Sequence, residues 1–168
     1  MIAAGVGVVG FLINKKIKEF HVEGPRDCEF AFGEHKIPIK GMPITAGDSM
    51  KKHLEKCRGY ISKLTTPNDI SHADLEAFNK LVDEAEWPEA LRKIQIGAAK
   101  NGLQAFVLWG IPIGQSECKI SVQNGEKIED VKAAKRRIEP EETLICVMSV
   151  KKKDKSVEEL TFKMGPVN

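Results

Sequence analysis

The chain has 168 residues, which suits one domain with a core large enough to fold without disulfide bonds or structural metal ions. Hydrophobic residues make up 42% of it and charged residues 30%, a balance typical of globular rather than disordered chains. The formal net charge of +2 argues against a protein whose whole surface binds nucleic acid, although it allows a local basic patch.

The first nineteen residues are the most unusual segment of the chain. Residues 1–13 carry no charge, and they lead into three lysines, Lys15, Lys16 and Lys18. We expect a helix over residues 3–19, whose apolar part would be about 20 Å long and too short to cross the roughly 30 Å hydrocarbon core of a bilayer. The segment also lacks the charged leader and the cleavage site of a secretory signal. It must therefore pack against protein, enter one face of a membrane or bind a ligand.

Two short strands are predicted next, over residues 28–32 and 35–39, with a turn at Gly33 and Glu34 between them. Pro38 suits a strand at the edge of a sheet, because proline has no N–H to donate to a neighbouring strand. We therefore expect the second of these strands at an edge.

Three helices are predicted in the middle of the chain, each with apolar residues at helical spacing. The first begins near Asp48 and reaches residue 64, and the third begins at Trp87 and ends at residue 101. The second begins at Ser71, which forms a capping box with Asp74 in place of the usual Glu or Gln. We interpret the apolar stripes of all three as faces turned toward the core.

The last part of the chain is predicted to hold most of the strands. Residues 103–109 form a short apolar run typical of a buried strand, and residues 118–122 alternate in polarity before a turn. Residues 127–138 place apolar side chains at near-helical intervals, which predicts a short helix. Two further strands, over residues 143–150 and 157–163, flank a charged turn and predict a hairpin.

These elements together predict the α+β class. Helices gather in the first half of the chain and strands in the second, unlike the regular alternation of a parallel α/β sheet. We expect an apolar N-terminal helix with a basic flank over residues 1–19 and a single α+β domain over residues 20–168. Its helices form a central three-helix region, and its mainly antiparallel sheet comes largely from the C-terminal half.

Two patterns that suggest specific chemistry do not hold in context. Gly5, Gly7 and Gly10 match the GxGxxG motif of dinucleotide-binding units, but the strand and the alternating elements that the motif requires are missing. A small-residue face for close helix packing or for shallow membrane insertion is the better interpretation. His53 and Cys57 have the spacing of half a zinc site, with no second pair nearby. We therefore predict no cofactor, no metal site and no catalytic residues.

Packing of the apolar segment on the domain's own core and its contact with a membrane surface or a partner fit the sequence equally well. Burial of its bulky side chains could contribute several kcal/mol at roughly 25 cal/mol per Å². Each nearby lysine could add about 1 kcal/mol close to anionic headgroups. The residues expected at this contact are Val8, Val9, Phe11, Leu12, Ile13, Lys15, Lys16 and Lys18.

Two further basic clusters are candidates for anion binding. If they converge in the fold, they would bind phosphate groups of lipid or nucleic acid. A solvated face and a charged turn that protects an edge strand are the simpler interpretations. The residues of the two clusters are Lys132, Lys135, Arg136, Arg137, Lys151, Lys152 and Lys153.

The sequence favours a non-enzymatic structural or assembly protein that forms oligomers. Its apolar N-terminus would contact an anionic membrane surface or neighbouring subunits, and the basic clusters would secure that contact, as in a viral matrix or coat component. A nucleic-acid-binding module using the basic clusters, and an enzyme with an unrecognised site, are the alternatives. The four cysteines are far apart and form no CxxC pair, which favours an intracellular, reducing compartment, with or without attachment to a membrane.

Overall fold

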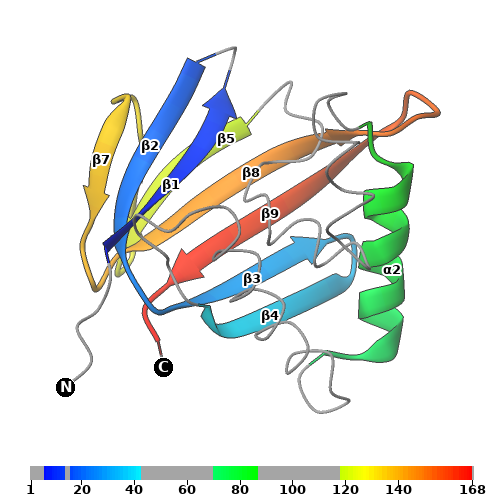
Figure 1. Cartoon of the computed structure of the whole chain (residues 1–168), viewed down its shortest axis with the longest axis horizontal. Helices are drawn as coiled ribbons and strands as arrows, with labels where there is room; N and C mark the ends of the chain where they lie inside the picture. The colour runs from blue at the N-terminus through cyan, green and yellow to red at the C-terminus, as the bar shows by residue number, and fades with distance from the viewer. Residues whose placement is uncertain (1–5, 14–15, 43–69, 87–117, 168) are drawn as a thin grey trace.

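A computed structural model describes residues 6–13, 16–42, 70–86 and 118–167 of the chain (Figure 1). Several sequence-based predictions lie outside these residues. They are the first and third central helices, the strand over residues 103–109, the His53 and Cys57 pair, Gly5 and Lys15.

The predicted N-terminal helix is wrong, because this part of the chain forms two antiparallel strands. Strand β1 (Val6–Ile13) pairs with β2 (Lys16–Glu23) along its whole length, from Val6 opposite Glu23 to Ile13 opposite Lys16. Buried and exposed residues alternate in β2, where Phe20 and Val22 are fully buried and His21 between them is exposed. This alternation is that of a strand with one buried face, and valine favours extended backbone.

A second prediction in the C-terminal half is also wrong, because residues 127–138 form two short strands rather than a helix. Strand β6 (Lys127–Asp130) pairs with the end of β5 (Cys118–Asn124) through the turn at Gly125. Strand β7 (Lys135–Ile138) leaves that sheet and runs parallel to β2. The result is a three-stranded sheet in the order β1-β2-β7.

The remaining strands form a six-stranded antiparallel sheet in the order β4-β3-β9-β8-β5-β6. Its other members are β3 (Arg26–Phe32), β4 (His35–Met42), β8 (Thr143–Lys151) and β9 (Val157–Gly165). The strands predicted at the corresponding positions, and the two predicted hairpin turns near residues 33 and 154, are confirmed. Pro38 lies in β4, an edge strand of this sheet, as the lack of an N–H requires.

Helix α2 (His72–Glu84) is the one long helix in the part of the chain that the structure describes. It begins as predicted, because the Ser71 hydroxyl accepts a hydrogen bond from the Asp74 backbone N–H at 3.1 Å. Its buried face consists of Phe78, Leu81 and Val82. None of the helical segments described is long and apolar enough to span a bilayer.

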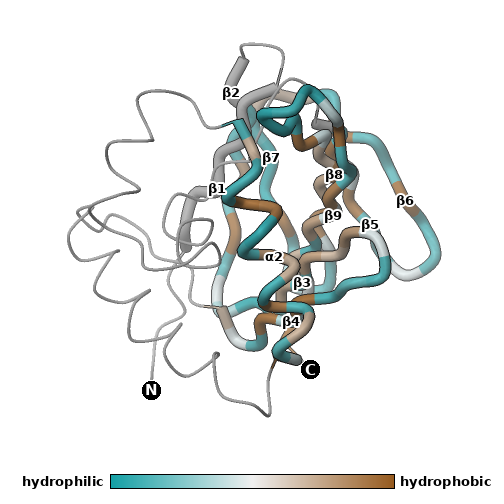
Figure 2. Tube along the Cα trace, turned by 90° about the vertical axis from the view of Figure 1, so that its right-hand side faces the viewer, coloured by the Kyte–Doolittle hydropathy of each residue, from teal (hydrophilic) through white to brown (hydrophobic). Residues whose placement is uncertain are grey.

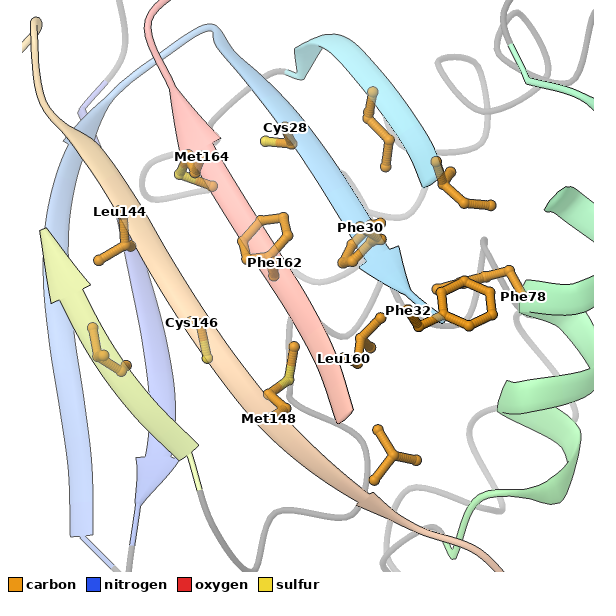
Figure 3. Close-up of a cluster of buried hydrophobic side chains, with 14 of the residues drawn as sticks. Cys28, Phe30, Phe32, Phe78, Leu144, Cys146, Met148, Leu160, Phe162 and Met164 are labelled. Atoms are coloured by element: carbon orange, nitrogen blue, oxygen red, sulfur yellow. The ribbon is translucent and has the colours of Figure 1, made fainter. Parts of the chain in front are cut away.

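The core lies against one face of the six-stranded sheet (Figure 3). Phe30 stacks on Phe162 of the neighbouring strand at 4.8 Å between ring centroids. Phe78 of the helix packs against the Phe30 ring at 5.3 Å. At the other end of the sheet, Phe20 and Ile138 of the small sheet join the same cluster of buried side chains. Figure 2 shows the helix in front of the strands, with β6 at the margin of the molecule.

This architecture corrects the predicted fold class. The described residues form a mostly β structure of two sheets with one helix, and not an α+β domain with an N-terminal helix and a three-helix region. The boundary that the sequence suggested between residues 19 and 20 falls inside β2.

Candidate interaction surface

The residues predicted to contact a membrane or a partner lie mainly in β1. Val8, Val9, Phe11, Leu12 and Ile13 all belong to this strand, which pairs with β2 alone among the described strands. No residue of β1 is charged or strongly polar. Because successive residues of a strand belong to opposite faces, both faces of β1 are apolar in sequence.

The lysines that follow this strand are part of the small sheet. Lys16 and Lys18 belong to β2. The Lys18 ammonium donates a hydrogen bond to the backbone carbonyl of Val131 at 2.7 Å, so this side chain ties β2 to the segment that leads into β7. Lys18 is therefore engaged inside the protein rather than extended toward solvent.

The basic residues of β7 face acidic residues of β2 and of the turn that follows β7. The Lys135 ammonium lies 3.8 Å from the Glu19 carboxylate, and the Arg137 guanidinium lies 3.4 Å from that of Glu23. The parallel register explains these pairs, since Glu19 lies opposite Lys135 and β2 continues alongside β7. Lys132 lies before β7 and is exposed.

The second basic cluster lies in the turn between β8 and β9, which contacts the end of helix α2. The Lys152 ammonium lies 2.9 Å from the Glu158 carboxylate and 3.4 Å from that of Glu84. The hydrogen bond with Glu158 is the main reason that the pKa of Lys152 is raised. Lys151 and Lys155 both contact the carboxylate of Glu86.

Backbone hydrogen bonds fix the same contact between helix and turn. The Lys153 N–H donates to the Glu84 carbonyl at 2.8 Å, and the Glu86 N–H donates to the Lys151 carbonyl at 2.8 Å. Ala85, the residue that ends the helix, adopts an extended conformation and bridges to Lys152. The turn is thus part of a contact within the chain, although the Lys151 and Lys153 side chains are exposed.

The two basic clusters do not converge. Strand β7 lies at one side of the molecule, and the turn between β8 and β9 extends from the opposite side, next to α2 (Figure 1). A single phosphate group cannot reach both, and most of their members already lie beside carboxylates.

A buried network of charges joins the two sheets. The Arg26 side chain is 2% exposed, and its guanidinium donates hydrogen bonds to the carbonyls of Glu23, Glu139 and Glu142 at 2.8 to 3.0 Å. The Glu142 side chain is also buried, and its carboxylate accepts from the Arg136 guanidinium at 2.9 Å and from the Glu139 N–H at 2.9 Å. Burial alone would raise the pKa of Glu142, but these two hydrogen bonds and the positive charges of Arg136 and Arg26 together outweigh burial and lower it.

One acid–base pair lies at the start of helix α2. The His35 Nδ1 atom lies 2.9 Å from an oxygen of the Asp74 carboxylate, and the His35 ring packs at 5.2 Å from that of Phe32. Hydrogen bonds from His35 and Ser71 lower the pKa of Asp74. An Asp–His pair orients an imidazole for proton transfer. The Ser71 hydroxyl contacts Asp74, where it begins the helix, and so sits on the carboxylate side of the pair.

Two cysteines, Cys28 and Cys146, lie in the core. Both are buried, and they form no disulfide bond. Burial raises the pKa of the Cys28 thiol to about 12, so the reactive thiolate is scarce at neutral pH. Within the described ranges, no group of three or more histidine, cysteine or carboxylate side chains is arranged to hold a metal ion.

The comparisons with known proteins give no relative. No protein-family model, curated protein or solved structure matches the chain.

No pattern in the sequence indicated the Arg26 and Glu142 network, because Arg26 lies more than a hundred residues from its partners. The acidic residues of the small sheet, which pair with the basic residues of β7, were easier to predict from the sequence. Glu19, His21 and Glu23 alternate with buried residues, a pattern that marks one exposed, partly acidic face of a strand.

Proposed function

We propose that this chain is a non-enzymatic structural protein that assembles with further copies of itself through strand β1. The supporting observation is a contrast in charge between the candidate contacts. Five of the seven basic residues in the two clusters lie within 4.0 Å of carboxylates of the same chain: Lys135, Arg136, Arg137, Lys151 and Lys152. Strand β1 has no charged residue and belongs to the edge of its sheet.

This contrast favours a protein partner over an anionic membrane or a nucleic acid. An ion pair with a neighbouring carboxylate reduces the field that a lysine or arginine presents to distant phosphates. An uncharged edge strand offers unpaired backbone N–H and C=O groups together with apolar side chains, which is what another strand requires. Pairing with a strand of a further copy would satisfy these backbone groups and bury these side chains.

Sedimentation equilibrium of the full chain, from low micromolar to several hundred micromolar protein, tests this proposal. We expect a concentration-dependent oligomer that is insensitive to salt. The double variant Val8→Lys with Val9→Lys introduces a charge on each face of β1 and should shift the protein to monomer. His21→Lys is the matched control, because it adds a charge at an exposed position of the neighbouring strand and should leave the oligomer intact.

A parallel co-sedimentation with anionic vesicles and a fluorescence titration with single-stranded RNA cover the alternatives. A monomer at all concentrations overturns the proposal. If such a monomer binds anionic vesicles, with binding lost at high salt, membrane association replaces it. If the monomer instead binds RNA, a nucleic-acid-binding module replaces it. Circular dichroism of each variant shows whether the strands are retained.

A further inference from the structure

The turn that joins β5 to β6 contains the dipeptide Asn124-Gly125. Asn124 is the last residue of β5, and both residues are exposed. Gly125 has a positive φ of 64°, and Glu126 after it does not, which is the pattern of a type II′ hairpin turn. Within the described ranges, no other asparagine is followed by glycine. The turn therefore places a side-chain amide next to a backbone nitrogen that no side chain shields.

We propose that Asn124 is a site of spontaneous deamidation, independent of the proposed assembly through β1. The Gly125 backbone nitrogen attacks the Cγ atom of the Asn124 side chain and loses its proton to water or hydroxide. The bond from Cγ to Nδ2 breaks, ammonia leaves, and a five-membered succinimide ring remains. Water then opens the ring at one of its two carbonyls and gives aspartate or isoaspartate, whose main chain runs through Cβ and Cγ. The conversion consumes one water molecule, releases one ammonia molecule and needs no cofactor.

The contacts of this turn leave the reacting atoms free. Neither the Asn124 side-chain amide nor the Gly125 N–H makes a hydrogen bond to another described residue. The Gln123 side chain donates to the Gly125 carbonyl at 3.0 Å and so occupies neither reacting atom. A Cβ placed on Gly125 would meet nothing within 4 Å, so the space around the nitrogen is open, and glycine allows the backbone to rotate toward attack. Asn79 lies inside helix α2, where the next N–H belongs to the helical hydrogen bonds.

Conversion to isoaspartate changes the pairing of β6 with β5. Asn124 lies opposite Lys127, and this pair closes the antiparallel ladder at the turn. Isoaspartate adds one main-chain atom at this point, so the residues after the turn no longer meet β5 in the same register. All four residues of β6 are exposed, and Figure 2 shows the strand at the margin of the molecule. Strand β5 pairs with β8 on its other side, so the change is confined to β6.

Incubation of the full-length protein at pH 8 and 37 °C in H₂¹⁸O, followed by tryptic digestion in ordinary water, tests the proposal. The new carboxylate contains ¹⁸O only if it forms in the intact protein. Residues 120–127 form one tryptic peptide with no other asparagine, so mass spectrometry assigns the change to residue 124. We expect labelled product there to accumulate more than about tenfold faster than at Asn79, because attack at Asn79 must first break a helical hydrogen bond.

The Asn124→Gln variant and a synthetic peptide of residues 120–127 are the matched controls. Glutamine keeps the amide but places it one methylene further from the Gly125 nitrogen, so the variant should stay unlabelled. The peptide has the same sequence without the fold. If the peptide loses its amide while the protein keeps that of Asn124, the proposal is wrong, because the turn then holds the two reacting atoms apart.

Hydrogen exchange of the aged protein tests the consequence for β6. The Asn124→Asp variant adds the charge without lengthening the backbone. Faster exchange at residues 128–130 in the aged protein, but not in this variant, supports the change of register. Exchange that is equally fast in the variant, or that is unchanged in the aged protein, overturns it.

Discussion

Replacement of Arg26 by methionine should be among the most destabilising single changes in the described part of the chain. The guanidinium donates to three carbonyls at 2.8 to 3.0 Å and approaches that of Pro140 at 3.4 Å, with the whole side chain 2% exposed. Methionine fills much of the same space without leaving a buried charge. It leaves the three closely bonded carbonyls without this donor and removes a positive neighbour of the Glu142 carboxylate.

The expected loss follows from these contacts. A buried polar group left without a partner costs about 1–3 kcal/mol, and Arg26→Met leaves three such carbonyls, which can relax in part. We therefore expect Arg26→Met to lower the free energy of unfolding by about 3–5 kcal/mol, a large part of the roughly 5–15 kcal/mol of a typical domain. Arg26→Lys keeps the charge but cannot reach all three carbonyls, so its loss should be intermediate.

Urea unfolding at neutral pH, followed by circular dichroism, measures this loss if the slope of the transition is unchanged. A decrease below about 1 kcal/mol for Arg26→Met would refute the reasoning, because it would mean that solvent or a rearranged loop satisfies the carbonyls at little cost.

Three further outcomes follow from the structure. Iodoacetamide at pH 8 should leave Cys28 unmodified in the folded protein and modify it in urea, as read by peptide mass spectrometry; rapid labelling of the native chain would contradict its raised pKa. Because the pKa of Asp74 is lowered in the folded state, its carboxylate stabilises the protein above the ordinary aspartate pKa of about 3.9, and this contribution is lost as the pH falls through the lowered value. Asp74→Asn should therefore lower the melting temperature more at pH 7 than at pH 2.5, and an equal decrease at both would count against this explanation. Gly165→Ala should cost about 1–3 kcal/mol in urea unfolding, because its new Cβ would lie 2.9 Å from the Thr143 hydroxyl oxygen. Adding Thr143→Ala should recover part of that loss, and no recovery would point to another source of strain.

The parts of the fold that were predictable carry strong local signals. The turn at Gly33, which has a positive φ of 54°, lies between two runs of alternating polarity, and both strands form as expected. Ser71 begins α2 because a hydroxyl at this position satisfies a backbone N–H of the first turn. These features depend on neighbours within a few residues.

The prediction of an N-terminal helix was wrong because an uninterrupted apolar run shows neither the helical nor the strand period of polarity. Residues 6–13 read equally well as a helix or a strand, and only the alternation around Phe20 and Val22 favours a strand. The helix predicted over residues 127–138 failed for a different reason. Ile128 is 58% exposed, so the spacing of apolar residues there does not correspond to a buried face. Pairing with β5 and β2 decided the structure of this segment.

The candidate surface was predictable only in part. The apolar residues of β1 were evident from composition, but the partners of the basic residues depend on which strands become neighbours. Lys135 lies beside Glu19 because β7 joins β2, a parallel pairing of segments more than a hundred residues apart. Local sequence patterns do not indicate which distant segments become neighbours.

The position of Arg26 gives the protein a mechanical property. The chain passes from the small sheet to the large one through Gly24 and Pro25, and again between Ile138 and Thr143. The same guanidinium holds carbonyls on both of these crossings. A pulling force applied to the β1–β2 hairpin would therefore load both connections through this one side chain, and sliding of one sheet past the other would break its hydrogen bonds.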